Sequence, residues 1–240
     1  MTRTRLGMLT PSSNTVLEPV TAAMLAGLPD VTAHFGRFRV TEIALSDQAM
    51  RQFDDSEIMK AAELLATAKV DVIAWNGTSA SWLGFHTDEH LQRRITDVTG
   101  TKASTCVLGY RDLLRMTGVT RVGLVSPYTD DVQARIARSW GSEGFQITAE
   151  RHKGLADNYS FCEITEAEIA DMSRAVVREG CEAVVVLCTN MAGAAVAPRI
   201  EPEIGVPLYD SVSVTLWQSM RVAGADPRRV KGWGRLFEAA

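Results

Sequence analysis

The sequence predicts an α/β protein built from two similar Rossmann-like domains, each with an open parallel sheet. Short apolar runs alternate with longer helical patterns along the 240 residues, which is the order typical of parallel α/β folds. The runs 70–75 and 183–187 are almost continuously apolar, as expected of strands that helices cover on both sides. Two stretches of the first half also recur in the second, which indicates pseudo-two-fold symmetry.

The elements of the first half follow from apolar periodicity and from residues that begin or end helices. Pro11–Thr15 is rich in side chains that cap helix N-termini, so a helix is expected to follow it. Gly100 and Gly118 are expected to end two later helices. Strands are expected at 6–9, 31–40, 70–75 and 102–105, and helices at 16–25, 56–68, 87–99 and 107–116.

The second half repeats this alternation around one long polar segment. Lys153–Thr165 is long for a loop of a compact domain, so a functional loop or lid is expected there. Asp210 and Ser211 can cap the last helix. Strands are expected at 122–125, 145–149, 183–187 and 206–209, and helices at 130–143, 166–179, 196–203 and 210–222. The expected domains are residues 1–117 with 212–240, and residues 118–211.

Two pairs of matching stretches carry the evidence for duplication. Leu6–Val16 matches Val122–Val132 without a gap, and the strand before Gly77 matches the strand before Cys188. Such strand–turn–helix units look alike in many proteins, but two matches at nearly the same offset favour duplication. Ligands bind beyond the carboxyl ends of the strands in open parallel sheets, so one site is expected in the cleft between the two halves.

The composition is that of an ordinary soluble protein. The chain is 46% hydrophobic and 22% charged with a net charge of −4, which gives no support for nucleic-acid or membrane-surface binding. No apolar run approaches the ~20 residues of a membrane span, and the N-terminus lacks the apolar segment of a signal peptide. A cytoplasmic location is expected, and homo-oligomer formation is left open.

Neither a disulfide nor a metal site is expected. The four cysteines form no C-x-x-C pair, and a cytosolic chain of this size does not need disulfides. Cys106 and Cys181 are interpreted as buried, since a free cysteine packs as a small hydrophobe. His86 to His90 fits the zinc-protease pattern H-x-x-E-H, but a solvated helix face is favoured because no third ligand is evident.

Four turns at the expected strand ends are rich in hydroxyl, amide and free backbone N–H groups. These turns are Pro11–Thr15, Gly77–Ser79, Pro127–Thr129 and Cys188–Asn190. Helix N-termini bind anions through such groups, and none of the turns is a Gly-rich phosphate loop. The expected ligand is a small anion, most simply a carboxylate. The alternative is that each hydroxyl only caps its own helix, which is worth ~1 kcal/mol.

The thiol of Cys188 is the main candidate for chemistry. A cysteine at a helix start can have a lowered pKa and can act as a nucleophile or as an acid–base group. None of the four histidines follows a strand in this pattern, so a Cys–His hydrolase is disfavoured. Proton transfer to or from carbon fits better, because it needs only a tuned thiol and an oxyanion pocket.

These turns together resemble the aspartate/glutamate racemase superfamily, in the branch of maleate cis-trans isomerases and arylmalonate decarboxylases. Pro11–Thr15 and Cys188–Asn190 are similar to isomerase motifs. Gly77–Ser79, Tyr128–Val132 and Gly234–Phe237 are similar to decarboxylase motifs. The resemblance covers essentially the whole chain. It implies two similar α/β domains around a cleft, with no cofactor and no metal.

The resemblance also implies how many cysteines take part. Racemases and isomerases of this group use two, one from each half, whereas the decarboxylases keep the second and have glycine at the first. Gly77 and Cys188 follow the decarboxylase pattern. By this resemblance Cys188 would protonate one face of an enediolate left after loss of carbon dioxide. The residues then expected to bind the substrate are Pro11, Asn14, Gly77, Thr78, Ser79, Tyr128, Thr189 and Asn190.

Two departures from the decarboxylase pattern bear on the substrate. Asn14 lies in an isomerase-like turn, and it is expected to bind a carboxylate as in the isomerases. Asn190 is isomerase-like as well, where the decarboxylases have glycine. Four side chains are candidates for an apolar pocket wall, although core packing is the simpler interpretation of each: Trp75, Trp82, Phe161 and Met191.

The leading hypothesis is a cofactor-free decarboxylase of a substituted malonate or a similar small dicarboxylate. By the resemblance, the carboxylate that becomes a dianion would be held by Thr78, Ser79, Tyr128 and the N–H groups near Cys188 and Thr189. The first alternative is a maleate cis-trans isomerase or an aspartate/glutamate-type racemase, although the first thiol is missing here. The second alternative is a non-catalytic protein that binds dicarboxylates.

Overall fold

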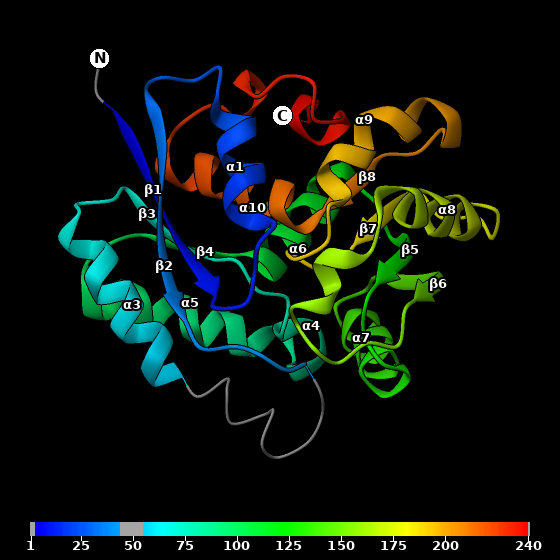
Figure 1. Ribbon diagram of the computed structural model, residues 1–240, viewed down its shortest axis with the longest axis horizontal. Helices are drawn as coiled ribbons and strands as arrows, with labels where there is room; N and C mark the ends of the chain where they lie inside the picture. Colours follow the sequence, from blue (N-terminus) through cyan, green and yellow to red (C-terminus); the bar gives the residue numbers. More distant parts are fainter. Residues whose placement is uncertain (1–2, 44–54, 240) are drawn as a thin grey trace.

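Two four-stranded parallel sheets form the centre of the structure, a computed structural model that describes residues 3–43 and 55–239 (Figure 1). The first sheet contains β1 (Thr4–Pro11), β2 (Val31–Phe38), β3 (Val72–Trp75) and β4 (Ala103–Thr105), in the order β2-β1-β3-β4. The second contains β5 (Arg121–Ser126), β6 (Gln146–His152), β7 (Ala183–Val186) and β8 (Leu208–Asp210), in the order β6-β5-β7-β8. The predicted fold of two parallel-sheet halves is confirmed, and the equal strand orders agree with duplication.

Helices cover both faces of the sheets (Figure 1). They are α1 (Leu17–Leu25), α3 (Asp55–Thr67), α4 (Ala80–Leu83), α5 (Phe85–Thr99), α6 (Cys106–Thr117), α7 (Asp130–Ser142), α8 (Glu166–Val177), α9 (Gly193–Ile204) and α10 (Ser211–Ala223). Short 3-10 helices are η1 (Ser160–Glu163), η2 (Pro227–Arg229) and η3 (Arg235–Glu238). The sequence does not predict α4, because four residues are too few to show a helical period, and it begins α5 and α9 two and three residues too late.

The paired sequence motifs have a packing reason. Every residue of β3 and β7 is buried, as predicted for strands that are covered on both sides. Gly7 and Gly123 occupy equivalent positions in the two central strands β1 and β5. A Cβ atom at Gly7 would lie 3.0 Å from Cγ2 of Val70, and one at Gly123 would lie 2.8 Å from Cγ2 of Val176. Glycine therefore recurs at this position because side chains of neighbouring segments pack directly against each strand.

The helices that follow the last strand of each sheet connect the two halves. α6 and α10 pack against each other, and α10 also packs on β1, β3 and β4 of the first sheet. The hydroxyl of Tyr110 on α6 lies 3.0 Å from the carbonyl oxygens of Val186 and Tyr209 in the second half. The predicted domain division, 1–117 with 212–240 and 118–211, stays a prediction that the packing of α10 favours.

The polar segment Lys153–Thr165 reaches from the second half to the first. The N–H of Ile43 donates to the carbonyl oxygen of Ala156 at 2.8 Å, and the N–H of Asn158 donates to that of Thr41 at 3.0 Å. The segment is thus a strap held by backbone hydrogen bonds, with η1 within it. Its predicted role as a functional loop stays a prediction.

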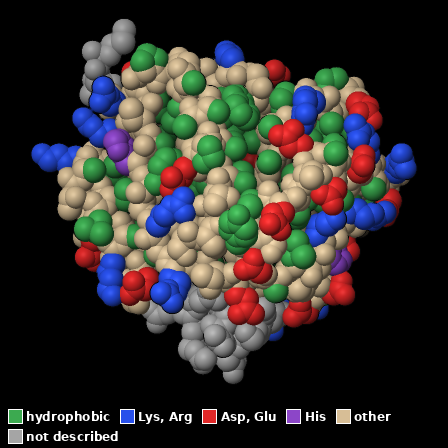
Figure 2. Space-filling model, in the orientation of Figure 1, with side chains coloured by type: hydrophobic (Ala, Val, Ile, Leu, Met, Phe, Trp, Pro, Cys, Tyr) green, Lys and Arg blue, Asp and Glu red, His purple; other side chains and the backbone are tan. Residues whose placement is uncertain are grey.

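The surface agrees with the modest net charge. Acidic and basic side chains are interspersed over the face shown in Figure 2, so the described residues of this face form no large basic patch. Within 3–43 and 55–239, no helix is long and apolar enough to cross a membrane.

Two carboxyl groups are buried near the starts of α6 and α10. Asp210 accepts hydrogen bonds from the N–H groups of Val212 at 2.9 Å and Ser213 at 3.1 Å. Asp88 on α5 is also buried, near Thr105 at the start of α6. Burial raises the pKa of each carboxyl to about 7, although hydrogen bonds lower it in part. Both groups therefore exchange protons near neutral pH.

We expect the protein to lose stability as the pH rises from about 4 to about 7. The unfolded carboxyls, with a pKa of 3.8, lose their protons before the buried ones do, so rising pH favours the unfolded state in this window. In Asp88→Asn the melting temperature should therefore fall less between about pH 5 and about pH 8 than in the wild type. Asp97→Asn, at an exposed position of the same helix, is the matched control. Equal pH slopes in the two variants would contradict the assignment to Asp88.

Candidate active site

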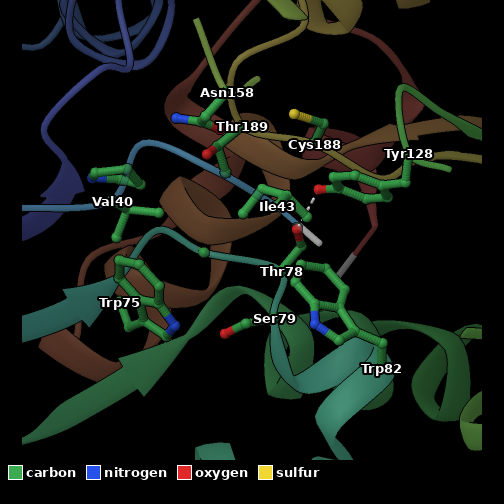
Figure 3. Close-up of a pocket in the computed structure, with 12 residues that line it drawn as sticks. Val40, Ile43, Trp75, Thr78, Ser79, Trp82, Tyr128, Asn158, Cys188 and Thr189 are labelled. Carbon is green, nitrogen blue, oxygen red and sulfur yellow. Dashed lines mark hydrogen bonds between the residues drawn. The ribbon is translucent and has the colours of Figure 1, made fainter. Parts of the chain in front are cut away.

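A narrow pocket with a cavity volume of about 20 Å³ lies between the two halves, at the carboxyl ends of the central strands (Figure 3). It is lined by Pro11, Val40, Ile43, Trp75, Gly77, Thr78, Ser79, Trp82, Tyr128, Asn158, Cys188 and Thr189. All four predicted turns contribute to this list. Two of the predicted residues, Asn14 and Asn190, are buried behind the lining rather than in it.

Two of the four candidates for an apolar pocket wall, Trp75 and Trp82, line the pocket. Met191 is buried and is not among the lining residues. Phe161 does not line the pocket; it packs edge-on against Tyr128, with ring centroids 5.6 Å apart. Asn158 in the strap also lines the pocket, and the polarity of the 153–165 segment was the sequence feature that could have indicated it. Nothing in the sequence pattern singles out Val40 or Ile43.

Cys188 is 3% exposed and follows β7, but α9 begins only at Gly193, so the thiol is not at a helix start. Burial raises the pKa of Cys188 to about 12. The N–H of Asn190, 3.3 Å from Sγ, and the Tyr128 hydroxyl lower it in part, while the charge of Asp210 raises it further. The possibility of a lowered pKa at a helix start does not apply here, because desolvation of the thiolate outweighs the nearby donors. The resting thiol is protonated at neutral pH.

Three hydroxyl-bearing side chains line the pocket together with this thiol. Oγ1 of Thr78 and the hydroxyl oxygen of Tyr128 are 2.6 Å apart, and both side chains are nearly buried. Burial holds the pKa of Tyr128 well above its usual value, so its hydroxyl stays a donor. The Ser79 side chain makes no capping hydrogen bond to α4 and instead lines the pocket. These hydroxyls can donate to the oxygens of a bound carboxylate.

The side chain of Asn14 joins the two halves. Its Oδ1 accepts from the N–H groups of Val16 at 3.0 Å and Leu17 at 2.9 Å, at the start of α1. Its Nδ2 donates to Oγ1 of Thr189 at 3.1 Å, and that hydroxyl donates to the carbonyl oxygen of Asn76 at 3.0 Å. The predicted role of Asn14 as a carboxylate ligand stays a prediction. Its contacts favour positioning of the turn after Cys188.

Asn190 makes the reciprocal connection from the second half. Its Oδ1 accepts from the N–H groups of Thr15 at 2.9 Å and Val16 at 3.3 Å. Its Nδ2 donates to the carbonyl oxygen of Asn158 at 2.7 Å. One buried amide therefore holds the start of α1, the strap and the thiol turn together. Asn190 also stays a predicted substrate ligand, with contacts that favour positioning.

The histidine motif on α5 lies outside this site. His86 and His90 are exposed, as expected for a solvated helix face. Elsewhere in the part of the chain that the structure describes, no three histidine, cysteine, aspartate or glutamate side chains come together as metal ligands. Cys106 and Cys181 are buried, as predicted.

The fold, with two similar parallel sheets, is shared with solved maleate isomerases and arylmalonate decarboxylases. A family model described as arylmalonate decarboxylase matches residues 6–237, and the chain belongs to this family. The match confirms the resemblance found in the sequence motifs, since its relatives include both kinds of enzyme.

Curated relatives of both activities match along nearly the whole chain. Arylmalonate decarboxylase from Bordetella bronchiseptica is 25% identical over 236 residues, covering 97% of this chain and 96% of that protein. Maleate isomerase from Pseudomonas putida is 25% identical over 252 residues, covering 98% of each. Because relatives of both activities match this chain about equally well, these comparisons do not distinguish a decarboxylase from an isomerase.

Solved structures of both kinds of enzyme are similar to this chain as well. A maleate isomerase from Pseudomonas putida gives a TM-score of 0.89 at 22% identity, covering 98% of both chains. A double mutant of arylmalonate decarboxylase in its liganded form gives 0.87 at 23% identity, covering 100% of both chains. These similarities establish the fold.

Replacing Asn190 with alanine should destabilise the protein by about 2 kcal/mol, because buried N–H and C=O groups of both halves lose their partner. Urea unfolding measures the change. Thr15→Ala is the matched control, since the Thr15 side chain is exposed and its backbone N–H is kept. If Asn190→Ala were as stable as this control, Asn190 would not hold the halves together.

Alkylation by iodoacetamide should be far slower at Cys188 than at the half-buried Cys162. Burial raises the pKa of Cys188, so only a very small fraction of the Cys188 thiols is ionised at pH 8. Peptide mass spectrometry can follow each cysteine separately. The Cys188 rate should still be rising with pH at about pH 9. A rate that levels off below that pH would show that the thiol is not held protonated.

Proposed function

We propose that this chain is a cofactor-free decarboxylase of a substituted malonate or a similar small dicarboxylate. One observation carries the proposal: the described lining of the pocket has a single thiol, Cys188. Burial raises the pKa of that thiol, which favours its protonated form. A protonated thiol is the state that a proton donor to carbon requires, whereas a nucleophile requires the thiolate. Across the pocket, position 77 is glycine and offers no second acid or base.

The hydroxyls of Thr78, Ser79 and Tyr128 hold the carboxylate that is retained. Loss of carbon dioxide breaks the bond between the α-carbon and the other carboxylate, and the electron pair moves onto the retained group as an enediolate. Negative charge grows on two oxygens, so donors that are already in place stabilise this state more than the ground state. The low exposure of Thr78 and Tyr128 strengthens each of these hydrogen bonds.

The leaving carboxylate has a different environment. Val40, Ile43 and Trp82 give the pocket apolar walls, where neutral carbon dioxide is better accommodated than a carboxylate. Cys188 then transfers its proton from Sγ to the α-carbon, and the enediolate returns to a carboxylate. The thiolate that remains is strongly basic at a pKa of about 12, so it regains a proton from water and closes the cycle.

An isomerase would use the thiol differently. A solved mutant of the Nocardia farcinica maleate cis-trans isomerase holds a covalently bound succinylcysteine intermediate. Formation of such an adduct needs an ionised thiol. The single thiol in the described lining, with glycine at position 77, supports the decarboxylase over the isomerase for this chain, and the burial of Cys188 is consistent with this choice.

Purified protein should release carbon dioxide from malonates that carry one aryl or alkyl substituent. Cys188→Ala should lower the rate roughly 10²–10⁴-fold, because the proton donor is lost. Tyr128→Phe should lower it by roughly 10²-fold, because one oxyanion donor is lost. Cys162→Ala, which removes a thiol that does not line the pocket, is the control and should match the wild type.

The same assays separate the alternatives. Conversion of maleate to fumarate, with a maleate adduct on Cys188, would replace the proposal with an isomerase. A rise in melting temperature with dicarboxylates but no turnover would indicate a binding protein. A Cys188→Ala variant as active as the wild type would refute the role given to the thiol.

A further inference from the structure

The backbone conformation of Gly77 does not itself require glycine. Its φ angle is not among the positive values that favour glycine. A Cβ atom at this position would instead lie 1.9 Å from Cζ2, 2.2 Å from Cε2 and 2.6 Å from Cη2 of Trp75. Real Cβ atoms essentially never approach so closely, so the indole already fills the space that a side chain at position 77 would need. Glycine is present here because Trp75 is present.

The indole is held firmly in this place. Trp75 is the last residue of β3, a strand paired on both sides with β1 and β4. Its side chain is 3% exposed, and its ring packs against Phe38 with centroids 5.1 Å apart. Moving the indole away from Gly77 would therefore disturb both the sheet edge and this aromatic pair.

Trp75 and Cys188 lie on opposite sides of the pocket (Figure 3). An enediolate is flat at its α-carbon, so a proton can arrive from either face. Cys188 can supply a proton to one face. An indole does not act as an acid or a base toward carbon at neutral pH. The indole therefore offers the other face only an apolar surface.

We propose that Trp75 is a specificity-determining residue that restricts proton transfer to the Cys188 face. It fills the place from which a side chain at position 77 would reach the reacting carbon. The protein would then form one enantiomer of a 2-substituted acid and would not racemise it. This inference rests on the proposed decarboxylation for its chemical consequence, whereas the packing of Trp75 over Gly77 can be tested without any activity.

The packing is tested by a double-mutant cycle on thermal stability. Gly77→Ala alone should lower the melting temperature markedly or prevent folding, because the new Cβ overlaps the indole. Adding Trp75→Leu should restore stability relative to Gly77→Ala, so that the two changes are not additive. Gly27→Ala is the control, since a Cβ there meets nothing within 4 Å. If Gly77→Ala is as stable as the control, the indole does not block position 77 and the proposal is overturned.

The chemical consequence is tested with one enantiomer of a 2-arylpropanoate in D₂O. The wild type and Gly77→Cys should not racemise it, whereas Trp75→Leu/Gly77→Cys should racemise it at least roughly tenfold faster than either single variant. Equal racemisation by Gly77→Cys alone, or none by the folded double variant, would overturn the proposal. If the wild type decarboxylates no malonate, the proposed function fails, and the stability cycle still decides whether Trp75 occupies this space.

Discussion

The hydrogen bonds that cross from the Cys188 turn to the first half are the interaction on which the site depends. Asn14 binds the Thr189 hydroxyl, and Asn190 accepts from the N–H groups of Thr15 and Val16, just before α1. Each of these bonds joins residues 174 or 175 positions apart in the sequence. These bonds hold the turn after the thiol against the first half, which carries Thr78. They also explain why the turns are rich in amides that do not line the pocket.

Burial connects this stabilising network with the chemistry. The same exclusion of water that makes the crossing hydrogen bonds strong also disfavours a thiolate at Cys188. A protonated thiol beside the hydroxyls of Thr78 and Tyr128 is suited to stabilising negative charge on oxygen and then supplying a proton. The Trp75 indole completes this arrangement by closing the opposite side of the pocket.

Much of the fold could be predicted from the sequence, because the apolar runs and the duplicated motifs locate the strands and bring their ends together. The match between Gly77 and Cys188 came from this alignment alone. The pKa of Cys188 could not be predicted, since it depends on burial by distant segments. The direction of Trp75 was equally hidden, because a strand covered on both sides shows no alternation that would separate pocket from core. The partners of Asn14 and Asn190 lie in the other half, where local patterns give no information.

The most direct test of this account is the distance from Sγ of Cys188 to the α-carbon of a bound, unreactive malonate analogue in a crystal structure. The account predicts a separation of about 3–4 Å, with the carboxylate oxygens at Thr78 and Tyr128 and the Trp75 indole against the opposite face of that carbon. An analogue bound with its α-carbon beyond reach of Sγ, or with Trp75 displaced from Gly77, would contradict it.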